Sequence, residues 1–330
     1  MLGLEHSSMS SVRPGSQLDH YVIEELVARS DTASIFRGTD LRRSLEVAIK
    51  IPHPEVEGDL LFYKRFCREQ AICQKLDHPA VVKAFEDEDR SQLYIVMELA
   101  RGRLLRQVLI EQRKLPVARA VKITLAICEA LEYIHTQRVV HRDLKPENIM
   151  VDAEDRIKLI DFGIASESGA PRLTFGKLSQ VMGTPDYISP EQVKGRRGDA
   201  RADIYALGVI LYEMLTGKIP FPGRNPFVSM HNRLVNNPIP PREIDPDISP
   251  ELQEILYRAL ERNPKDRYSS AAEFASDLRH RDQVEVADRP ELRDWQRQRT
   301  PWTQSLAFHG MLAMIPVVIF GLMLIIARLG

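Results

Sequence analysis

The stretch HRDLKPEN at residues 141–148, followed by DFG at residues 161–163, decides the fold of this chain. Between them lies RIKLI at residues 156–160, whose alternating polar and apolar residues predict a short strand. A hairpin at this point would bring Asp143, Lys145, Asn148 and Asp161 together. Carboxylate and amide oxygens suit a divalent cation, and an ammonium group suits phosphate. These four side chains therefore predict a site for a nucleoside triphosphate with its metal.

HRDLKPEN with DFG at this separation resembles the eukaryotic-type (Hanks-type) protein kinase family. A lysine two residues after Asp143 is typical of its serine/threonine branch, and the chain is similar to bacterial membrane-anchored members. The resemblance implies an α+β, bilobal protein kinase fold. It implies that Asp143 accepts the proton of the substrate hydroxyl and that Lys145 steadies the γ-phosphate of ATP. It also assigns Asn148 and Asp161 to Mg²⁺, with Mn²⁺ as an alternative.

The same resemblance extends to the nucleotide. VAIK at residues 47–50 matches a strand motif of the family, which implies that Lys50 contacts the phosphates and pairs with Glu69. The other expected adenine contacts are Ile35, Ala48, the gatekeeper Met97, the hinge residues Glu98 and Ala100, and Met150 beneath the base.

The glycine-rich loop departs from the family pattern. In a hairpin expected over residues 24–38, Ala28, Ser30 and Ala33 stand where the family has glycines that let backbone amides approach the phosphates. A Cβ at each position restricts φ. The sequence therefore predicts weakened ATP binding at this loop.

Several further residues take expected roles from the resemblance. His141 packs structurally, Glu191 pairs with Arg267, and Asp203 binds the backbone of the 141–148 loop. Arg142 indicates control by phosphorylation of the segment that follows DFG. Thr174 and Ser179 are the candidate phosphosites, and Thr184 resembles the family's substrate-docking threonine.

Periodicity predicts helices over residues 59–76 and 117–137 and a strand over residues 91–99. The first helix is expected to bury Leu61, Phe62, Phe66, Ala71, Ile72 and Leu76.

The composition fits a globular cytoplasmic body with a membrane anchor. The chain has 330 residues, 28% of them charged, and a net charge of -1 that gives no reason to expect nucleic-acid binding. We expect a flexible segment at 1–17, a kinase domain at 18–280 (N-lobe about 18–98, C-lobe about 103–280), a charged linker at 281–304, a transmembrane helix at 305–327 and a short tail at 328–330.

The expected span rests on residues 310–327, which contain no charged side chain. About 20 apolar residues cross a bilayer core as a helix. Arg293, Arg297 and Arg299 precede the run, and basic flanks favour the cytoplasmic side. We therefore expect a single-pass protein of a bacterial inner membrane with its kinase domain in the cytoplasm. Self-association of the span is left open.

The main hypothesis is a serine/threonine protein kinase that takes ATP and protein substrates and phosphorylates itself. A pseudokinase scaffold tethered to the membrane, with weak nucleotide binding, is the alternative favoured by the missing glycines. A small-molecule phosphotransferase would share the aspartates, but GTPDYISPEQ at residues 183–192 favours a protein substrate. The sequence names neither the substrate nor the activating signal.

Overall fold

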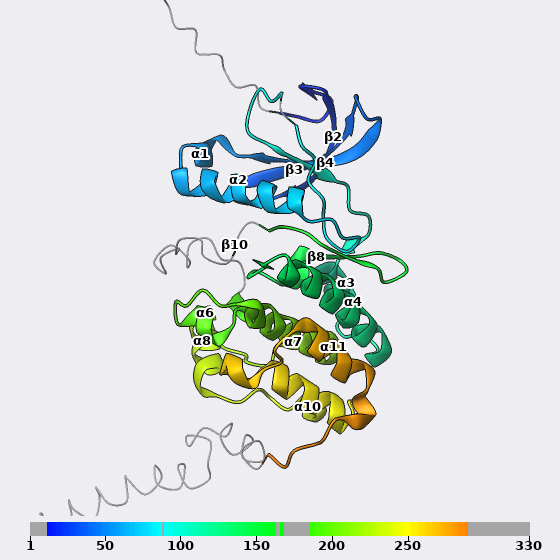
Figure 1. Cartoon of the computed structure of the whole chain (residues 1–330), viewed down its shortest axis with the longest axis vertical. Coiled ribbons are helices and arrows are strands. Elements are labelled where there is room, and N and C mark those ends of the chain that lie inside the picture. The colour runs from blue at the N-terminus through cyan, green and yellow to red at the C-terminus, as the bar shows by residue number, and fades with distance from the viewer. Residues whose placement is uncertain (1–11, 88, 163–165, 168–184, 290–330) are drawn as a thin grey trace, which may run out of the picture. The chain divides into compact units, whose positions relative to one another are not determined.

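The computed structural model describes residues 12–87, 89–162, 166–167 and 185–289. They form a bilobal kinase fold with a β-sheet N-lobe and a helical C-lobe, as predicted (Figure 1). No helix in this part of the chain combines the length and the apolar character needed to cross a membrane. The expected span at 305–327, and Thr174, Ser179 and Thr184, lie outside the described residues.

The N-lobe is built on an antiparallel sheet whose strands follow one another in chain order. The strands are β1 (Gln17–Leu18), β2 (Tyr21–Arg29), β3 (Ala33–Asp40), β4 (Leu45–Pro52) and β5 (Ile95–Glu98). One face carries the apolar core of the lobe, made by Leu18, Tyr21, Ile23, Phe36, Val47, Ile49, Ile51, Tyr94 and Val96. Because side chains alternate along a strand, the opposite face carries Lys50, with Ile35 as its cross-strand partner, and Ala48 opposite Met97.

Helix α2 (Leu60–Lys75) follows the short helix α1 (Pro54–Glu57) and lies beside the sheet (Figure 1). It begins where Asp59 accepts hydrogen bonds from the amides of Leu61 and Phe62, which are otherwise unpaired at a helix start. Its inner face buries Phe66 and Ile72, and Leu76 is buried just after its end, as expected. Leu61 and Phe62, which were also expected to be buried, are only half-buried. The expectation for Ala71 was wrong, because this residue is exposed, and Cys73 is buried in its stead.

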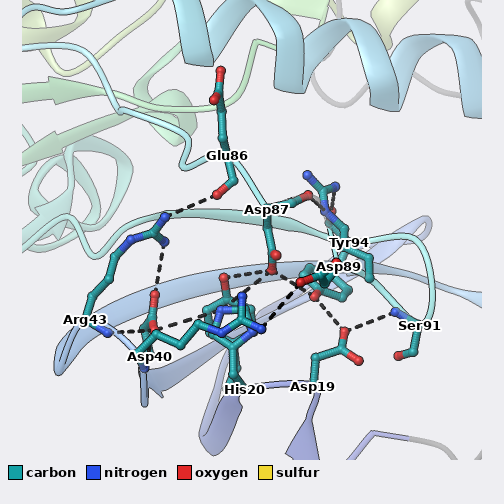
Figure 2. Close-up of polar contacts among 12 residues, drawn as sticks. Asp19, His20, Asp40, Arg43, Glu86, Asp87, Asp89, Ser91 and Tyr94 are labelled. Atoms are coloured by element: carbon teal, nitrogen blue, oxygen red, sulfur yellow. Dashed lines mark hydrogen bonds and ion pairs between the residues drawn. The ribbon is translucent and has the colours of Figure 1, made fainter.

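A buried polar cluster ties the β1–β2 turn to the residues before β5 (Figure 2). The Tyr94 hydroxyl lies 2.6 Å from an Asp19 carboxylate oxygen and 3.1 Å from one of Asp87. Asp19 also accepts from the Ser91 amide at 3.2 Å. The strand expected over 91–99 is therefore shortened to β5, since its first residues bind this cluster and not a neighbouring strand.

The C-lobe is helical, and α4, α7, α10 and α11 pack together in it (Figure 1). Its helices are α3 (Leu105–Gln112), α4 (Val117–Thr136), α6 (Pro190–Val193), α7 (Ala200–Thr216), α8 (Pro226–Val235), α9 (Pro241–Ile244), α10 (Pro250–Ala259) and α11 (Ala271–Arg279). Its 3-10 turns are η1 (Pro146–Asn148), η3 (Pro185–Tyr187), η4 (Pro264–Asp266) and η5 (Arg281–Gln283). Helix α7 is buried on nearly every side, which fits its almost unbroken apolar sequence.

Short strands position the 141–148 loop. They are β6 (Arg103–Leu104), β7 (Val139–Val140), β8 (Ile149–Val151), β9 (Ile157–Leu159) and β10 (Ser166–Glu167). The loop leaves β7 and returns through η1 into β8, which pairs antiparallel with β9. The predicted hairpin between the HRDLKPEN and DFG motifs is thus present.

Candidate active site

The loop between β7 and β8 brings three of the predicted side chains together. Lys145 Nζ donates a hydrogen bond of 2.7 Å to Asp143 Oδ2. The Asn148 amide nitrogen donates to the Asp143 carbonyl oxygen at 2.8 Å and to Oδ2 at 3.2 Å. Burial raises the pKa of the Asp143 carboxyl above its usual range, against the opposing effect of the Lys145 ammonium. Asp143 is therefore held in place by Lys145 and Asn148, and its pKa depends on burial and on the Lys145 ammonium.

Asp203 of α7 binds the backbone at the start of this loop. Its carboxylate accepts from the amides of His141 at 2.9 Å and Arg142 at 2.7 Å, and it lies 2.8 Å from His135 Nε2. Burial opposes its ionisation, but the hydrogen bond from His135 and the nearby positive charge outweigh it and lower the pKa of Asp203. These bonds stabilise Arg142 at a φ of 65°, a left-handed conformation that a side chain disfavours.

Lys50 of β4 meets carboxylates from both lobes. Its Nζ lies 2.6 and 2.8 Å from the two oxygens of Glu69 in α2, and 3.5 Å from Asp161 Oδ1. Burial disfavours the Lys50 ammonium, but the charges of Asp161 and Glu69 outweigh burial and raise its pKa. The Asp161 side chain is 47% exposed, whereas that of Glu69 is 7% exposed. Asp161 is thus the carboxylate of this group that a metal ion can reach.

His141 is completely buried and its ring packs on Phe162, with ring centroids 4.8 Å apart. Phe162 is itself completely buried, and it follows Asp161, whose φ is 64°. The packing of Phe162 therefore anchors the strained residue that carries the accessible carboxylate. The structural role expected for His141 stays a prediction.

A protein-family model described as the protein kinase domain matches residues 21–280. The chain belongs to the protein kinase family. The match includes β2 to α11, and so every element that carries the contacts described above.

The chain is similar to several bacterial proteins that are named serine/threonine-protein kinases. The chain is 34% identical over 279 residues to the serine/threonine-protein kinase PknB of Mycolicibacterium smegmatis, covering 83% of this chain and 45% of that protein. It is 37% identical over 263 residues to a probable serine/threonine-protein kinase of Streptomyces coelicolor, covering 78% of this chain and 39% of that protein. The chain thus spans less than half the length of these curated relatives.

A solved structure supports the same fold. The kinase domain of Mycobacterium tuberculosis PknI, crystallised as a point mutant, is similar with a TM-score of 0.64 and 26% identity, covering 82% of this chain and 99% of that one. The family uses ATP with a divalent metal ion, typically Mg²⁺. Asp161 and Asn148 offer the oxygen ligands that such an ion prefers.

The turn between β2 and β3, where the family has its glycine-rich loop, closes on itself through a side chain. The Ser30 amide donates to the Ala33 carbonyl at 2.9 Å, and the Ala33 amide donates to the Ser30 hydroxyl oxygen at 3.1 Å. Ala28 and Ser30 are exposed near the end of the β2–β3 hairpin, whereas Ala33 is buried. A glycine at position 30 would lack this hydroxyl, so the departure from the family pattern changes which groups the turn amides bind.

The hinge between the lobes is braced by a contact that the sequence analysis missed. Glu98 accepts from the Lys83 amide at 2.9 Å and from Lys158 Nζ of β9 at 2.7 Å. Gly102 follows with a φ of 123°, and a Cβ there would lie 2.5 Å from the Val151 carbonyl oxygen. Glycine is therefore required for the chain to pass β8. Ala100 lies between these two fixed points, and Met150 lies in β8 opposite Leu104.

The expected Glu191–Arg267 pair is present and buried. Arg267 Nη1 and Nη2 donate to the two Glu191 oxygens at 2.9 and 2.7 Å, in the two-pronged geometry that arginine favours. Arg267 also donates to the carbonyls of Arg201, Glu261 and Arg262, so α6, α7 and the end of α10 are joined by one side chain.

Arg142 has donors that the described residues leave unused. Its Nη2 lies 3.3 Å from the Gly198 carbonyl, whereas Nε and Nη1 are buried without a hydrogen-bond partner in the part of the chain that the structure describes. Burial, together with the charges of Arg197 and Arg68, lowers the pKa of its guanidinium to about 10. A phosphate near Arg142 would neutralise this concentration of positive charge, and control by phosphorylation stays a prediction.

Proposed function

We propose that this chain transfers the γ-phosphate of ATP to serine and threonine hydroxyls of proteins, itself included. The observation that carries the proposal is the convergence of Lys50, Glu69 and Asp161 across the two lobes, because it combines a phosphate-binding cation with a metal-binding carboxylate. Its family membership and its named relatives support the same class of reaction.

In this proposal each side chain has a distinct task. Asp143 orients the acceptor hydroxyl and takes its proton, and Lys145 offsets charge on the transferred group. Lys50, held by Glu69, binds the α- and β-phosphates. Asp161 and Asn148 would hold Mg²⁺, which supplies charge neutralisation along the phosphates when bound. Ile35, Ala48, Met97, Glu98, Ala100 and Met150 would surround the adenine. Little covalent chemistry falls to the protein, so positioning and electrostatics provide most of the rate.

The decisive test uses full-length protein with labelled Mg-ATP and a general protein substrate. We expect label on serine and threonine, and we expect Asp143→Asn to reduce transfer by at least about 100-fold, as for loss of a general base. Asp282→Asn, which removes an exposed carboxylate near the end of the domain, is the matched control. Mass spectrometry of the autophosphorylated protein would also report whether Thr174 and Ser179 are modified.

The pseudokinase alternative is favoured by the alanine and serine residues of the β2–β3 turn. It predicts nucleotide binding, measured by thermal shift, without transfer to any hydroxyl. That result would replace the kinase proposal with a scaffold.

We also propose that residues 305–327 anchor the chain in a membrane, with residues 281–304 as a linker and the kinase domain in the cytoplasm. The support is the run at 310–327 without a charged side chain and the basic residues before it.

A further inference from the structure

Arg106 of α3 joins three other elements of the C-lobe. Its Nε donates to Glu147 Oε1 of η1 at 2.8 Å, and its Nη1 donates to Glu213 Oε1 of α7 at 2.7 Å. Its Nη2 donates to the hydroxyl of Tyr187 in η3. The Tyr187 hydroxyl in turn lies 2.5 Å from Glu213 Oε2. One guanidinium thus occupies the space between two carboxylates.

This network lies on the side of the site where the acceptor peptide is expected. Glu147 follows Asp143 by four residues and directly precedes Asn148. Tyr187 belongs to the GTPDY segment that the family resemblance associates with substrate docking. The side chain of Glu147 is 36% exposed, and Arg106 covers its Oε1, so a peptide bound beside Asp143 would reach this carboxylate once Arg106 is removed.

The segment that carries Tyr187 is held rigidly. Arg233 of α8 is almost completely buried, and it donates to the carbonyl oxygens of Pro185 at 2.7 Å and Asp186 at 2.5 Å. Because Arg233 fixes η3, Tyr187 and its hydrogen-bond partner Glu213 should keep their places when Arg106 is removed.

Apart from these two arginines and Lys145, whose ammonium is close enough for the Glu147 charge to raise its pKa, the surroundings are acidic. Burial raises the pKa of Asp186, and the negative charges of Glu213 and Glu147 act in the same direction. Glu147 Oε2 is buried and has no hydrogen-bond partner among the described residues. Even with Arg106 in place, this region therefore has an acceptor to spare, and without Arg106 both carboxylates would need a cation.

We propose that Arg106 determines substrate specificity by filling an acidic subsite that would otherwise bind an arginine side chain of the peptide substrate. The inference rests on the proposed kinase function. A substrate arginine has the same planar donor fork as Arg106 and could bind Glu147 and Glu213 in the same way. The wild-type protein then has no preference for arginine near the acceptor serine of a peptide, and a variant without Arg106 gains this preference.

The test compares peptides that differ in one side chain. Each peptide has a central serine in an alanine background, with arginine or norleucine at one position from −5 to +4, a window of about ten residues set by the reach of an extended chain. For the wild-type protein we expect the arginine/norleucine ratio of kcat/KM to stay within about threefold of one, which is under 1 kcal/mol. For Arg106→Met we expect the ratio to rise about tenfold at one position or two adjacent ones, the effect of one charge-assisted pair, mainly through KM.

Matched variants separate specificity from structure. Arg106→Lys keeps a cation in place and should keep the wild-type ratio. Arg103→Met removes an exposed arginine three residues earlier, which pairs with Glu111 at 2.5 Å, and should change nothing. Adding Glu147→Gln to Arg106→Met should cancel the gain. If Arg106→Met does not fold, Arg106→Gln loses the same charge while keeping a donor, and the same criteria apply to it.

Two results would overturn the inference: an equal loss of kcat/KM for arginine and norleucine peptides in the variant, or a tenfold arginine preference already present in the wild type. Binding of the labelled arginine peptide, followed by fluorescence anisotropy without ATP, keeps the two proposals apart. Selective binding by the variant without any transfer would support the subsite and contradict the kinase proposal. Phosphate transfer by the variant without a preference for the arginine peptide would support the kinase proposal and contradict the subsite.

Discussion

Asp143 is subject to two opposing influences within its own loop. Burial raises the pKa of its carboxyl, and the Lys145 ammonium at 2.7 Å lowers it. A carboxylate that takes a hydroxyl proton must be ionised, so activity should fall as the pH drops through this pKa. Lys145→Met removes the lowering influence. We expect the acid limb of the kcat/KM profile to move to higher pH.

The measurement compares the shape of the two profiles, because Lys145→Met will also reduce their height. Lys194→Met, at an exposed lysine after α6, is the control and should leave the limb where it is. A limb that stays in place, or moves to lower pH, would mean that Asp143 does not set it.

For single residues, motif spacing predicted the ion pairs between residues that belong to motifs. It did not predict the contacts of residues that lie outside any motif. The Lys50–Glu69 and Glu191–Arg267 pairs were expected and are present. The sequence did not indicate the contacts of Arg106, because this residue belongs to no motif and an arginine on a short amphipathic helix usually faces water. Its partners come from residues 147, 187 and 213, a set that only the folded chain brings together.

Among the elements, the β2–β3 hairpin invites the most direct experiment. The Ser30 hydroxyl binds the Ala33 amide, a group that in a glycine-rich turn would be free to approach a phosphate. Replacing Ala28, Ser30 and Ala33 together by glycine should lower KM for ATP by about fivefold, equivalent to about 1 kcal/mol. The same change should lower the melting temperature, because glycine loses more entropy on folding.

Steady-state kinetics with varied ATP measures the effect of these glycines. Ala71→Gly in the exposed face of α2 provides a destabilised control without a loop change. An unchanged KM for ATP in the triple variant would show that the native turn closes over nucleotide well.

The observed bounds of an element agree closely with the predicted ones where a capping residue marks its end. Helix α2 was expected over 59–76 and spans Leu60–Lys75, since Asp59 is an N-cap residue that can be recognised in advance. Which small residue faces inward could not be predicted, because Ala71 and Cys73 contribute little to the periodic pattern. The shortened β5 depends on a cluster in which residues 87, 91 and 94 meet residue 19, which is about 70 residues away in the sequence.

In the molecule as a whole, two interlobe ion pairs lie at the proposed nucleotide site. Lys50 reaches Asp161 at 3.5 Å, and Lys158 reaches Glu98 at 2.7 Å. The first involves the proposed metal ligand, so ATP with its metal would replace a contact that already draws the lobes together. The second lies at the hinge and can persist through that exchange. Nucleotide binding therefore need not separate the lobes.

The membrane anchor is the proposal that concerns the whole chain. We expect the full-length protein to float with phosphatidylcholine vesicles in a density gradient and to resist extraction by salt. Val318→Asp with Leu322→Asp should abolish flotation, since each aspartate at the centre of a span costs about 2.5–3.5 kcal/mol. Gln296→Asp in the linker is the control and should leave flotation intact. If the wild-type chain stayed in the soluble fraction, residues 305–327 would need another partner for their apolar surface, and the kinase would reach its substrates without being confined to a membrane.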